Sequence, residues 1–323
     1  MYKHFYGLTR SPFEISPDPF FLFPTPRHNE ALAALYYGVR RYKGFVVMTG
    51  EVGTGKTLLL RCLVDLFSQN HMAYAYVSNP ALSPLQFLQY IMGEFGLQGR
   101  GKTKGEMLVE LSCFLIARHR QGFSTVLVVD EAQVLHRETM EEIRLLTNLE
   151  TAQHKLLQIV LVGQSELEEI LASPNLRQLR QRIALWCRLA PLDELETGQY
   201  IARRLELAGF SASRQPLFSP ETVSIIHHFS SGIPRLINVL CDNSLIAAYG
   251  QQAPTVPSDV VAQVAAEFRP HGVEEPANNN GNGNYKAVLG KLREVLDCFE
   301  EIEGSHIPDP LSSEGAEHNE QRL

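Results

Sequence analysis

The sequence predicts an α/β fold in which helices flank a five-stranded, mostly parallel sheet and a small all-α domain follows. Short apolar runs alternate with longer amphipathic stretches up to Pro191, a pattern that produces βαβ units with helices on both faces of a sheet. Beyond Pro191 only helical patterns continue. The 323 residues suffice for two such domains and a tail.

The predicted strands are short runs of mainly apolar, β-branched or aromatic residues. They lie at 45–49, 73–78, 125–129, 157–162 and 184–189. Apolar periodicity and start signals such as a first-turn proline predict helices between them. These helices lie at 30–42, with Thr25 or Asn29 as the cap, at 58–67, from Ser83 onward, at 106–120 and at 137–149.

The chain divides into four predicted parts. Residues 1–30 hold closely spaced prolines that exclude regular helix, and their phenylalanines favour an ordered extended segment packed on the core. Residues 31–191 form the α/β domain. Residues 192–270 form a helical lid domain, with helices at 192–208, 220–229, 234–249 and 258–268.

Residues 271–323 form an acidic linker and tail, with an asparagine-rich stretch at 278–284. Apolar residues spaced four and three apart predict an amphipathic helix at 286–302, which docks on a partner or folds back on its own domain. The tail carries the whole net charge of −7. The balanced remainder does not favour nucleic-acid binding driven by bulk charge.

The composition is that of a soluble globular protein, with 44% hydrophobic and 20% charged residues. Five scattered cysteines without a CxxC pair argue against a disulfide framework or a zinc site and fit a reducing cytosol. The N-terminus lacks the apolar region of a signal peptide, and no stretch approaches the ~20 apolar residues that span a bilayer. We therefore expect a cytoplasmic protein, peripheral at the inner membrane only through a partner.

The most specific motif follows the first predicted strand and fits the phosphate-binding pattern G-x-x-x-x-G-K-[ST]. The predicted nucleotide-binding residues are Gly50, Glu51, Val52, Gly53, Thr54, Gly55, Lys56, Thr57 and Leu58. The glycines let backbone N–H groups point inward at phosphate oxygens. Lys56 supplies positive charge for the β- and γ-phosphates, and Thr57 is expected to ligate Mg²⁺. The motif predicts a nucleoside triphosphate site.

An acidic motif ends the third predicted strand. The apolar run 126–129 leads into Asp130 and Glu131, and the carboxyl edge of a parallel sheet places them near the phosphate-binding loop. We expect Asp130 to bind Mg²⁺ and Glu131 to polarise a water that attacks the γ-phosphate. Acidic residues at a strand end can instead cap the next helix, but the phosphate-binding loop upstream favours the catalytic role.

Further polar residues complete the predicted site. Gln164 follows the fourth strand. We expect it to hold the γ-phosphate or the attacking water, and the alternative is a loop glutamine without a role in the site. Arg180 and Arg182 lie in an arginine cluster that forms either an arginine finger for a neighbouring subunit or a solvated or nucleic-acid-binding helix. Arg235 follows Pro234 at a helix start, from which it reaches the γ-phosphate when the lid closes.

In order and spacing these motifs resemble those of AAA+ ATPases, and especially the ExeA-type secretion ATPases, a group that includes general secretion pathway protein A and the MSHA pilus-biogenesis ATPase. The aromatic and proline pattern at 5–22 and the segments 49–57, 129–133 and 161–167 carry the closer resemblance, which covers about residues 1–270. The group is related to the TniB-like transposition proteins.

The resemblance implies ATP binding, Mg²⁺-dependent hydrolysis and a homo-oligomer in which the arginine finger acts in trans. It also implies a role in assembling a secretion, pilus or exopolysaccharide-export machine. Members often carry a transmembrane helix and a peptidoglycan-binding domain after the ATPase, and this sequence has neither. We therefore expect a separate membrane-protein partner in the envelope machine.

Two other functions stay open. A DNA-transposition helper of the TniB-like kind would bind DNA when loaded with ATP, although the neutral core and acidic tail do not favour DNA. A nucleotide-gated adaptor would use ATP only to stabilise one assembly, with little turnover. Steady-state hydrolysis with and without DNA or membranes separates these possibilities from the secretion ATPase.

Overall fold

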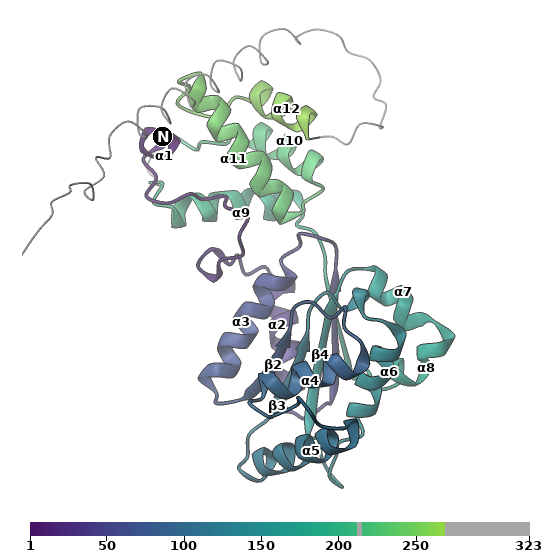
Figure 1. Cartoon of the computed structure of the whole chain (residues 1–323). Coiled ribbons are helices and arrows are strands. Elements are labelled where there is room, and N and C mark those ends of the chain that lie inside the picture. The colour runs from purple at the N-terminus through teal and green to yellow at the C-terminus, as the bar shows by residue number, and fades with distance from the viewer. Residues whose placement is uncertain (212–214, 269–323) are drawn as a thin grey trace, which may run out of the picture. The chain divides into compact units, whose positions relative to one another are not determined.

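Strands and helices alternate along the first part of the chain, and only helices follow (Figure 1). The computed structural model describes residues 1–211 and 215–268. Within them, Met1–Tyr249 and Ala253–Phe268 form one compact unit. The linker predicted at 278–284, the amphipathic helix predicted at 286–302 and the rest of the tail lie outside the described residues.

The predicted five-stranded parallel sheet is confirmed. Its strands are β1 (Phe45–Gly50), β2 (Ala73–Val77), β3 (Thr125–Val129), β4 (Leu157–Gly163) and β5 (Leu185–Leu189). They lie in the order β2-β3-β4-β1-β5, and every pairing is parallel. Strands β1, β3 and β4 are buried throughout, as expected for apolar strands covered on both faces. Their carboxyl ends meet at one edge, which therefore gathers the polar residues that follow them.

Helices pack on both faces of the sheet. They are α2 (Pro26–Arg40), α3 (Lys56–Gln69), α4 (Pro84–Glu94), α5 (Lys104–Arg120), α6 (Arg137–Leu146), α7 (Glu166–Ala172) and α8 (Arg177–Arg180), with 3-10 turns η2 (Ala132–Val134) and η3 (Pro174–Leu176). Side chains alternate along β1, so Phe45 and Val47 join the core under α4–α8. Val46 and Met48 join the core under α2 and α3. The sheet thus divides two hydrophobic cores.

Some helix boundaries differ from those predicted. Helix α2 starts four residues earlier, because the Thr25 hydroxyl accepts the His28 N–H, so Thr25 and not Asn29 is the cap. Helix α5 starts two residues earlier, because Thr103 and Glu106 form a reciprocal capping box. Helix α6 ends three residues earlier than expected, at Leu146.

The N-terminal segment is not extended throughout, contrary to the prediction. It contains helix α1 (Tyr2–Tyr6) and the 3-10 turn η1 (Pro19–Phe21). Helix α1 forms because the prolines begin only at Pro12, and Gly7, with φ 72°, ends it in the left-handed conformation. Phe13 and Phe21 are 1% and 6% exposed, so the segment contributes to the core.

The helical region consists of α9 (Glu194–Leu207), α10 (Pro220–Ser230), α11 (Pro234–Gly250) and α12 (Ser258–Glu267). Helix α9 begins after Asp193, which shares a capping box with Glu196. Gly232 has φ +71°, and a Cβ there would lie 1.9 Å from the Leu192 carbonyl oxygen. Only glycine fits, so the turn between α10 and α11 is fixed against the start of the region.

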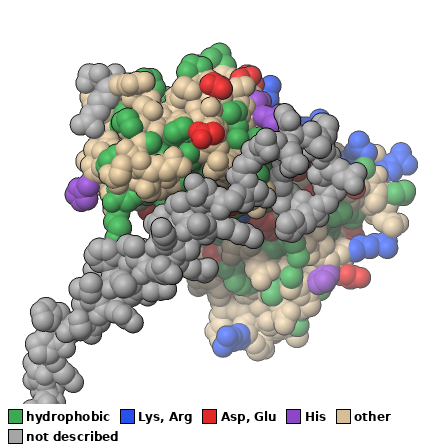
Figure 2. Space-filling view, turned by 90° about the horizontal axis from the view of Figure 1, so that it is seen from above, with side chains coloured by type: hydrophobic (Ala, Val, Ile, Leu, Met, Phe, Trp, Pro, Cys, Tyr) green, Lys and Arg blue, Asp and Glu red, His purple; other side chains and the backbone are tan. Residues whose placement is uncertain are grey.

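Seen from above, hydrophobic side chains are scattered over the surface among backbone atoms and other uncharged side chains (Figure 2). On the helical region the exposed ones include Leu195, Leu236 and Ile246. None of the helices in the described part of the chain has both the length and the hydropathy that a bilayer span requires.

Candidate nucleotide-binding site

The loop between β1 and α3 curls around the Lys56 ammonium group. Gly53 and Gly55 adopt φ +85° and +98°, which side-chain-bearing residues rarely adopt. Lys56 is 6% exposed, and its Nζ donates to the carbonyl oxygens of Gly50, at 2.8 Å, and Glu51, at 3.0 Å. Burial lowers the Lys56 pKa, and the carboxylates of Glu131 and Asp130 oppose that shift. The loop thus holds a desolvated cation that an anionic ligand would stabilise.

Helix α3 begins at Lys56, two residues before the predicted start, so its positive N-terminal end points into the loop. Thr54 is 1% exposed, and its hydroxyl donates to Glu51 O at 2.8 Å, which closes the turn. The Glu51 carboxylate accepts a hydrogen bond from Ser165. Val52 and Leu58 line the pocket beside the loop. The predicted loop residues therefore all lie in or beside one pocket wall.

Asp130 lies directly opposite the start of α3. Its Oδ2 accepts hydrogen bonds from Thr57 Oγ1, at 3.3 Å, and from Tyr76 Oη, at 3.0 Å. The carboxyl group is 4% exposed. Burial raises the Asp130 pKa, and the hydrogen bonds oppose the increase. A bound cation would offset the cost of burying this charge.

The donors at this point fit Mg²⁺. Thr57 and Asp130 present a hydroxyl and a carboxylate oxygen, the hard ligands that Mg²⁺ prefers. The two oxygens are 3.3 Å apart, so one ion can contact both. No cluster of three or more His, Cys, Asp or Glu side chains occurs among the described residues, and Mg²⁺ bound to phosphates needs only one or two protein ligands.

Glu131 is held by two glutamine side chains. Gln133 Nε2 donates to Glu131 Oε2 at 2.6 Å, and Gln164 Nε2 donates to the same oxygen at 3.2 Å. Gln133 Oε1 accepts the backbone N–H of Gln164 at 3.0 Å, which closes the network. Glu131 also has φ +50°, an uncommon conformation for a residue with a side chain. The carboxylate is therefore fixed at the carboxyl edge, close to Asp130.

The first turn of α2 supports the loop from the other side. His28 is 8% exposed, and its Nδ1 and Nε2 lie 2.6 Å from Thr25 Oγ1 and 3.3 Å from the Thr54 carbonyl oxygen. Burial lowers the His28 pKa, and the contact with Thr54 opposes the shift. His28 thus links the N-terminal segment to the phosphate-binding loop as a neutral ring.

The start of α11 contacts the same loop. The Arg235 N–H donates to the Gly53 carbonyl oxygen at 3.2 Å. A Cβ on Gly53 would lie 2.7 Å from Arg235 Cβ and 2.9 Å from Ile233 Cγ2, so the close approach requires glycine. Arg235, Gln164 and Glu131 line one pocket together with the phosphate-binding loop.

The remaining wall of this pocket joins α9 to residues 14–18 of the N-terminal segment. Arg204 on α9 is 5% exposed and donates to the Pro12 carbonyl oxygen and, at 2.6 Å, to Tyr200 Oη. Its guanidinium lies 4.7 Å from the Phe21 ring centroid. Tyr200 Oη in turn donates to Asn238 Oδ1 at 2.9 Å. A buried cation therefore connects α9, α11 and the N-terminal segment.

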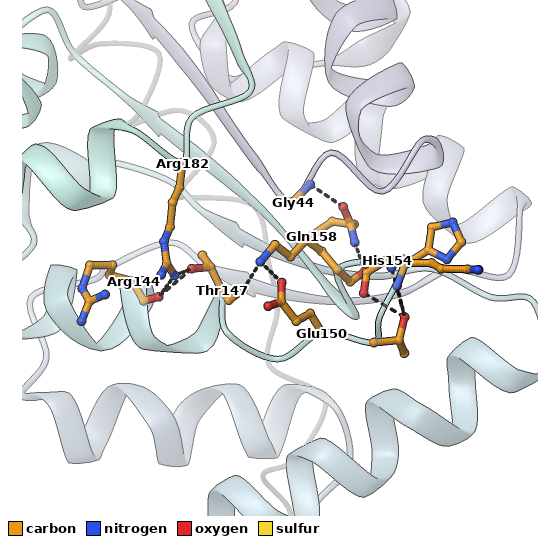
Figure 3. Close-up of polar contacts among 10 residues, drawn as sticks. Gly44, Arg144, Thr147, Glu150, His154, Gln158 and Arg182 are labelled. Atoms are coloured by element: carbon orange, nitrogen blue, oxygen red, sulfur yellow. Dashed lines mark hydrogen bonds and ion pairs between the residues drawn. The ribbon is translucent and has the colours of Figure 1, made fainter.

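The two candidate finger arginines differ in their surroundings. Arg182 donates to the Arg144 carbonyl oxygen at 2.9 Å and to the Thr147 hydroxyl, so it ties the end of α6 to the loop before β5 (Figure 3). Arg180 is exposed. Neither lines the pocket that holds Lys56.

Comparison with known proteins agrees with this geometry. Residues 39–171 match the family described as AAA domain. This segment is therefore similar to AAA domains. It contains the phosphate-binding loop, the acidic strand end at β3 and Gln164 after β4, while Arg235 and Arg204 lie beyond the matched residues.

The predicted resemblance to ExeA-type proteins is confirmed. The general secretion pathway protein A of Aeromonas hydrophila is 45% identical over 252 residues. The match covers 78% of this chain and 45% of the relative, so the chain spans less than half the length of that protein.

Solved structures of AAA+ proteins share the fold. Cdc6p from Pyrobaculum aerophilum superposes with a TM-score of 0.60 at 18% identity and covers 80% of this chain and 71% of its own. The ORC2 protein of Aeropyrum pernix, in ADPNP–ADP complexes, gives 0.56 at 18% identity, with 78% and 72% covered. The P-loop NTPase fold is thereby confirmed.

The structure adds residues that the sequence analysis did not assign. Tyr76 on β2 had no assigned role, yet its hydroxyl reaches Asp130. Gln133 lies inside the motif 129–133 but had no role, although it is two residues from Glu131. The Thr25-x-x-His28 spacing is a detectable signal for the N-cap of α2. Arg204 gave no sequence signal, because its partner Pro12 is distant in the chain.

Proposed function

We propose that this chain binds ATP with Mg²⁺ and hydrolyses it, and that its nucleotide state drives the assembly of a secretion machine in the cell envelope. The observation that supports hydrolysis best is the cluster of Lys56, the Thr57–Asp130 pair and the fixed Glu131 at one sheet edge. The AAA domain and the similarity to general secretion pathway protein A support the ATPase class and the secretion context.

In the proposed mechanism each residue has one task. Lys56 and the N-terminus of α3 bind the phosphates, and Thr57 and Asp130 hold the metal. Bound Mg²⁺ supplies electrophilic stabilisation of the phosphoryl oxygens. Glu131 orients the attacking water and accepts its proton, while Gln133 and Gln164 keep the carboxylate in place. The side-chain amide of Gln164 carries a second N–H group, which in this proposal senses the γ-phosphate.

We further propose that α9–α12 act as a lid and that Arg235 responds to the γ-phosphate. Its backbone contact with Gly53 already connects the lid to the phosphate-binding loop. In an oligomer, Arg180 is the better candidate for the arginine finger in trans, because it is exposed whereas Arg182 is engaged within its own subunit. Residues 31–191 and 192–270 remain the proposed domain limits.

The proposed setting is the cytoplasmic side of the inner membrane, next to a membrane-protein partner of the secretion machine. The name of the relative that is 45% identical supports this setting. The transposition-helper alternative predicts hydrolysis stimulated by duplex DNA. Hydrolysis that is indifferent to DNA and responds to envelope components fits the proposed function.

Substituting Glu131→Gln tests the catalytic assignment. Loss of a general base should lower the hydrolysis rate by about 10²–10⁴-fold and leave ATP binding intact. Steady-state phosphate release and fluorescent-nucleotide titration measure the two quantities. Glu138→Gln, at an exposed position on α6, is the matched control and should retain full activity. Undiminished hydrolysis by Glu131→Gln would exclude this residue as the base.

Substituting Lys56→Ala tests the binding assignment separately. Removing the buried charge should weaken nucleotide affinity by about a hundredfold, the scale of a charge-assisted hydrogen bond. Isothermal titration with ATP and Mg²⁺ measures the loss. Unchanged affinity in a folded Lys56→Ala protein contradicts the proposed site.

A further inference from the structure

The edge of the sheet at the amino-terminal ends of the strands carries a group of cations. Arg40, Arg41 and Lys43 lie at the end of α2 and in the loop into β1, and Arg118 and Arg120 lie at the end of α5 before β3. Because the strands are parallel, both segments lie at the same edge, opposite the phosphate-binding loop. We call these five residues the basal cations.

Aromatic contacts bring the two basic segments together. Tyr42, which two basal cations flank, lies 5.5 Å from His119 and 5.0 Å from His154 between ring centroids, and the two histidine rings are 5.5 Å apart. Figure 3 shows His154 in the loop before β4, near Gly44. Three loops of the sheet edge thus form one continuous surface.

The basal cations lack acidic partners in the described residues. No carboxylate there lies within 4.0 Å of any of them, and the nearby Glu150 pairs with Lys155. Arg118 donates to the His71 carbonyl oxygen, but its Nε is buried without an acceptor among the described atoms, and so is His119 Nδ1. The surface therefore offers positive charge that no carboxylate of the described residues neutralises.

Helix C-termini at this edge offset only part of the charge. Helices α2, α3, α5 and α6 end here, and each C-terminus contributes about half a negative elementary charge. These four ends thus balance about two of the five cations. Some of the basal cations therefore neutralise the negative helix C-termini, and the others leave the surface with a net positive charge.

The exposed face of α5 carries apolar side chains between Glu106 in its first turn and the basal cations at its end. Val109 is 66% exposed and Ile116 38% exposed, and the exposed Cys113 lies between them. These residues follow the spacing of one helix face, which continues to Arg120. On α2, Tyr37 is 50% exposed. The guanidinium carbon of Arg41, one turn later, lies 6.0 Å from the centroid of the Tyr37 ring. Cations and exposed apolar side chains therefore adjoin on both helices.

We propose that this surface binds an anionic lipid membrane, with the basal cations at the headgroup phosphates and the apolar face of α5 at the interface. Membrane surfaces attract clusters of Lys and Arg and accommodate aromatic and aliphatic side chains beside them. A nucleic acid would engage the cations and leave the α5 face in water. The inference deepens the proposed envelope function, on which the choice of a membrane rests.

Flotation of the full chain with vesicles tests this inference. Binding to vesicles that contain phosphatidylglycerol should exceed binding to phosphatidylcholine vesicles and fall as salt is added. Each surface cation contributes about a fivefold factor in partitioning. The double variant Arg41→Glu/Lys43→Glu should therefore bind at least about twentyfold more weakly. Val109→Ser/Ile116→Ser should weaken binding without changing the salt dependence.

The control is Arg27→Glu/Arg137→Glu, which makes the same charge change at exposed positions in the first turns of α2 and α6, opposite the helix ends at this edge, and should bind as the unmodified chain does. Equal binding to neutral vesicles, or equal loss in the control, overturns the inference. Duplex DNA that binds through Arg41 and Lys43 while vesicles do not would assign the surface to nucleic acid instead. Phosphate release from the same samples separates the two proposals. Hydrolysis without vesicle binding contradicts only the membrane inference. Vesicle binding without hydrolysis contradicts only the proposed ATPase activity.

Discussion

Asp130 shows how one carboxylate is prepared for a metal by residues from separate elements. It is 4% exposed, and two hydroxyl groups donate to the same oxygen, Thr57 from α3 and Tyr76 from β2. Burial raises its pKa, whereas hydrogen bonds to the charged form favour ionisation. Tyr76 therefore helps to keep the carboxylate available for a cation.

The substitution Tyr76→Phe should move the acidic limb of the pH–rate profile to higher pH. Loss of the Tyr76 hydroxyl raises the Asp130 pKa, because this hydrogen bond favours the charged carboxylate. A hydrogen bond worth about 1 kcal/mol corresponds to about a fivefold fall in the rate on the acidic limb. The rate at alkaline pH should change little. Tyr74→Phe is the matched control, because the Tyr74 ring packs near Phe67 on the same face of β2. A rate loss independent of pH would contradict this role for Tyr76.

At the scale of elements, the first turn of α2 supports the phosphate-binding loop through a direct contact. Thr25 caps α2, and His28 from the first turn of that helix reaches the Thr54 carbonyl oxygen. The Thr54 side chain is itself buried beneath the loop, so the His28 ring contacts a part of the loop that is already packed.

Protonation of His28 should weaken this support in acid. Burial lowers its pKa in the folded state, so the unfolded chain binds the proton more strongly. The contribution of neutral His28 is complete above the unfolded pKa of about 6.5 and is lost as pH falls through the folded pKa. The melting temperature of the unmodified chain should thus drop relative to His28→Gln between neutral pH and pH 5. His4→Gln, at an exposed position, should melt in parallel with the unmodified chain at every pH.

Over the whole molecule, the N-terminal segment connects the α/β domain to the helices that follow it. The Arg204 guanidinium joins Pro12, Phe21 and Tyr200, and the Thr9 N–H donates to the Ala208 carbonyl oxygen at 2.8 Å. These contacts close one side of the nucleotide pocket. The first residues of the chain are therefore part of the site.

Replacing Arg204 with alanine should cost about 2–4 kcal/mol of unfolding free energy, because a buried hydrogen-bonded and ring-stacked cation is lost. Arg203→Ala is the matched control, since Arg203 pairs on the surface with Glu206 and should cost at most about 1 kcal/mol. Urea unfolding measures both. Limited proteolysis should cleave the N-terminal segment faster in Arg204→Ala. Equal stability of the two variants would show that Arg204 does not secure the segment.

The order of elements and the main chemistry could be predicted because both depend on residues close together in the chain. Strand β3 and its two acidic residues are contiguous, and the loop at 50–57 has a fixed local pattern. Predicted helix boundaries were less accurate where two nearby residues could each serve as the N-cap, as Thr25 and Asn29 could for α2. Hydrophobic periodicity does not detect such side-chain hydrogen bonds.

The sequence by itself determined that this protein has a parallel α/β sheet, a phosphate-binding loop and an acidic strand end, since local periodicity and motif spacing encode them. Only the tertiary structure decided that Tyr76 contacts Asp130, that Gln133 and Gln164 share one Glu131 oxygen, and that Arg204 reaches the N-terminal segment. It also gathered the basal cations at one edge. These contacts join residues far apart in sequence. The strand order β2-β3-β4-β1-β5 and the packing of the helices, which local patterns do not specify, bring them together.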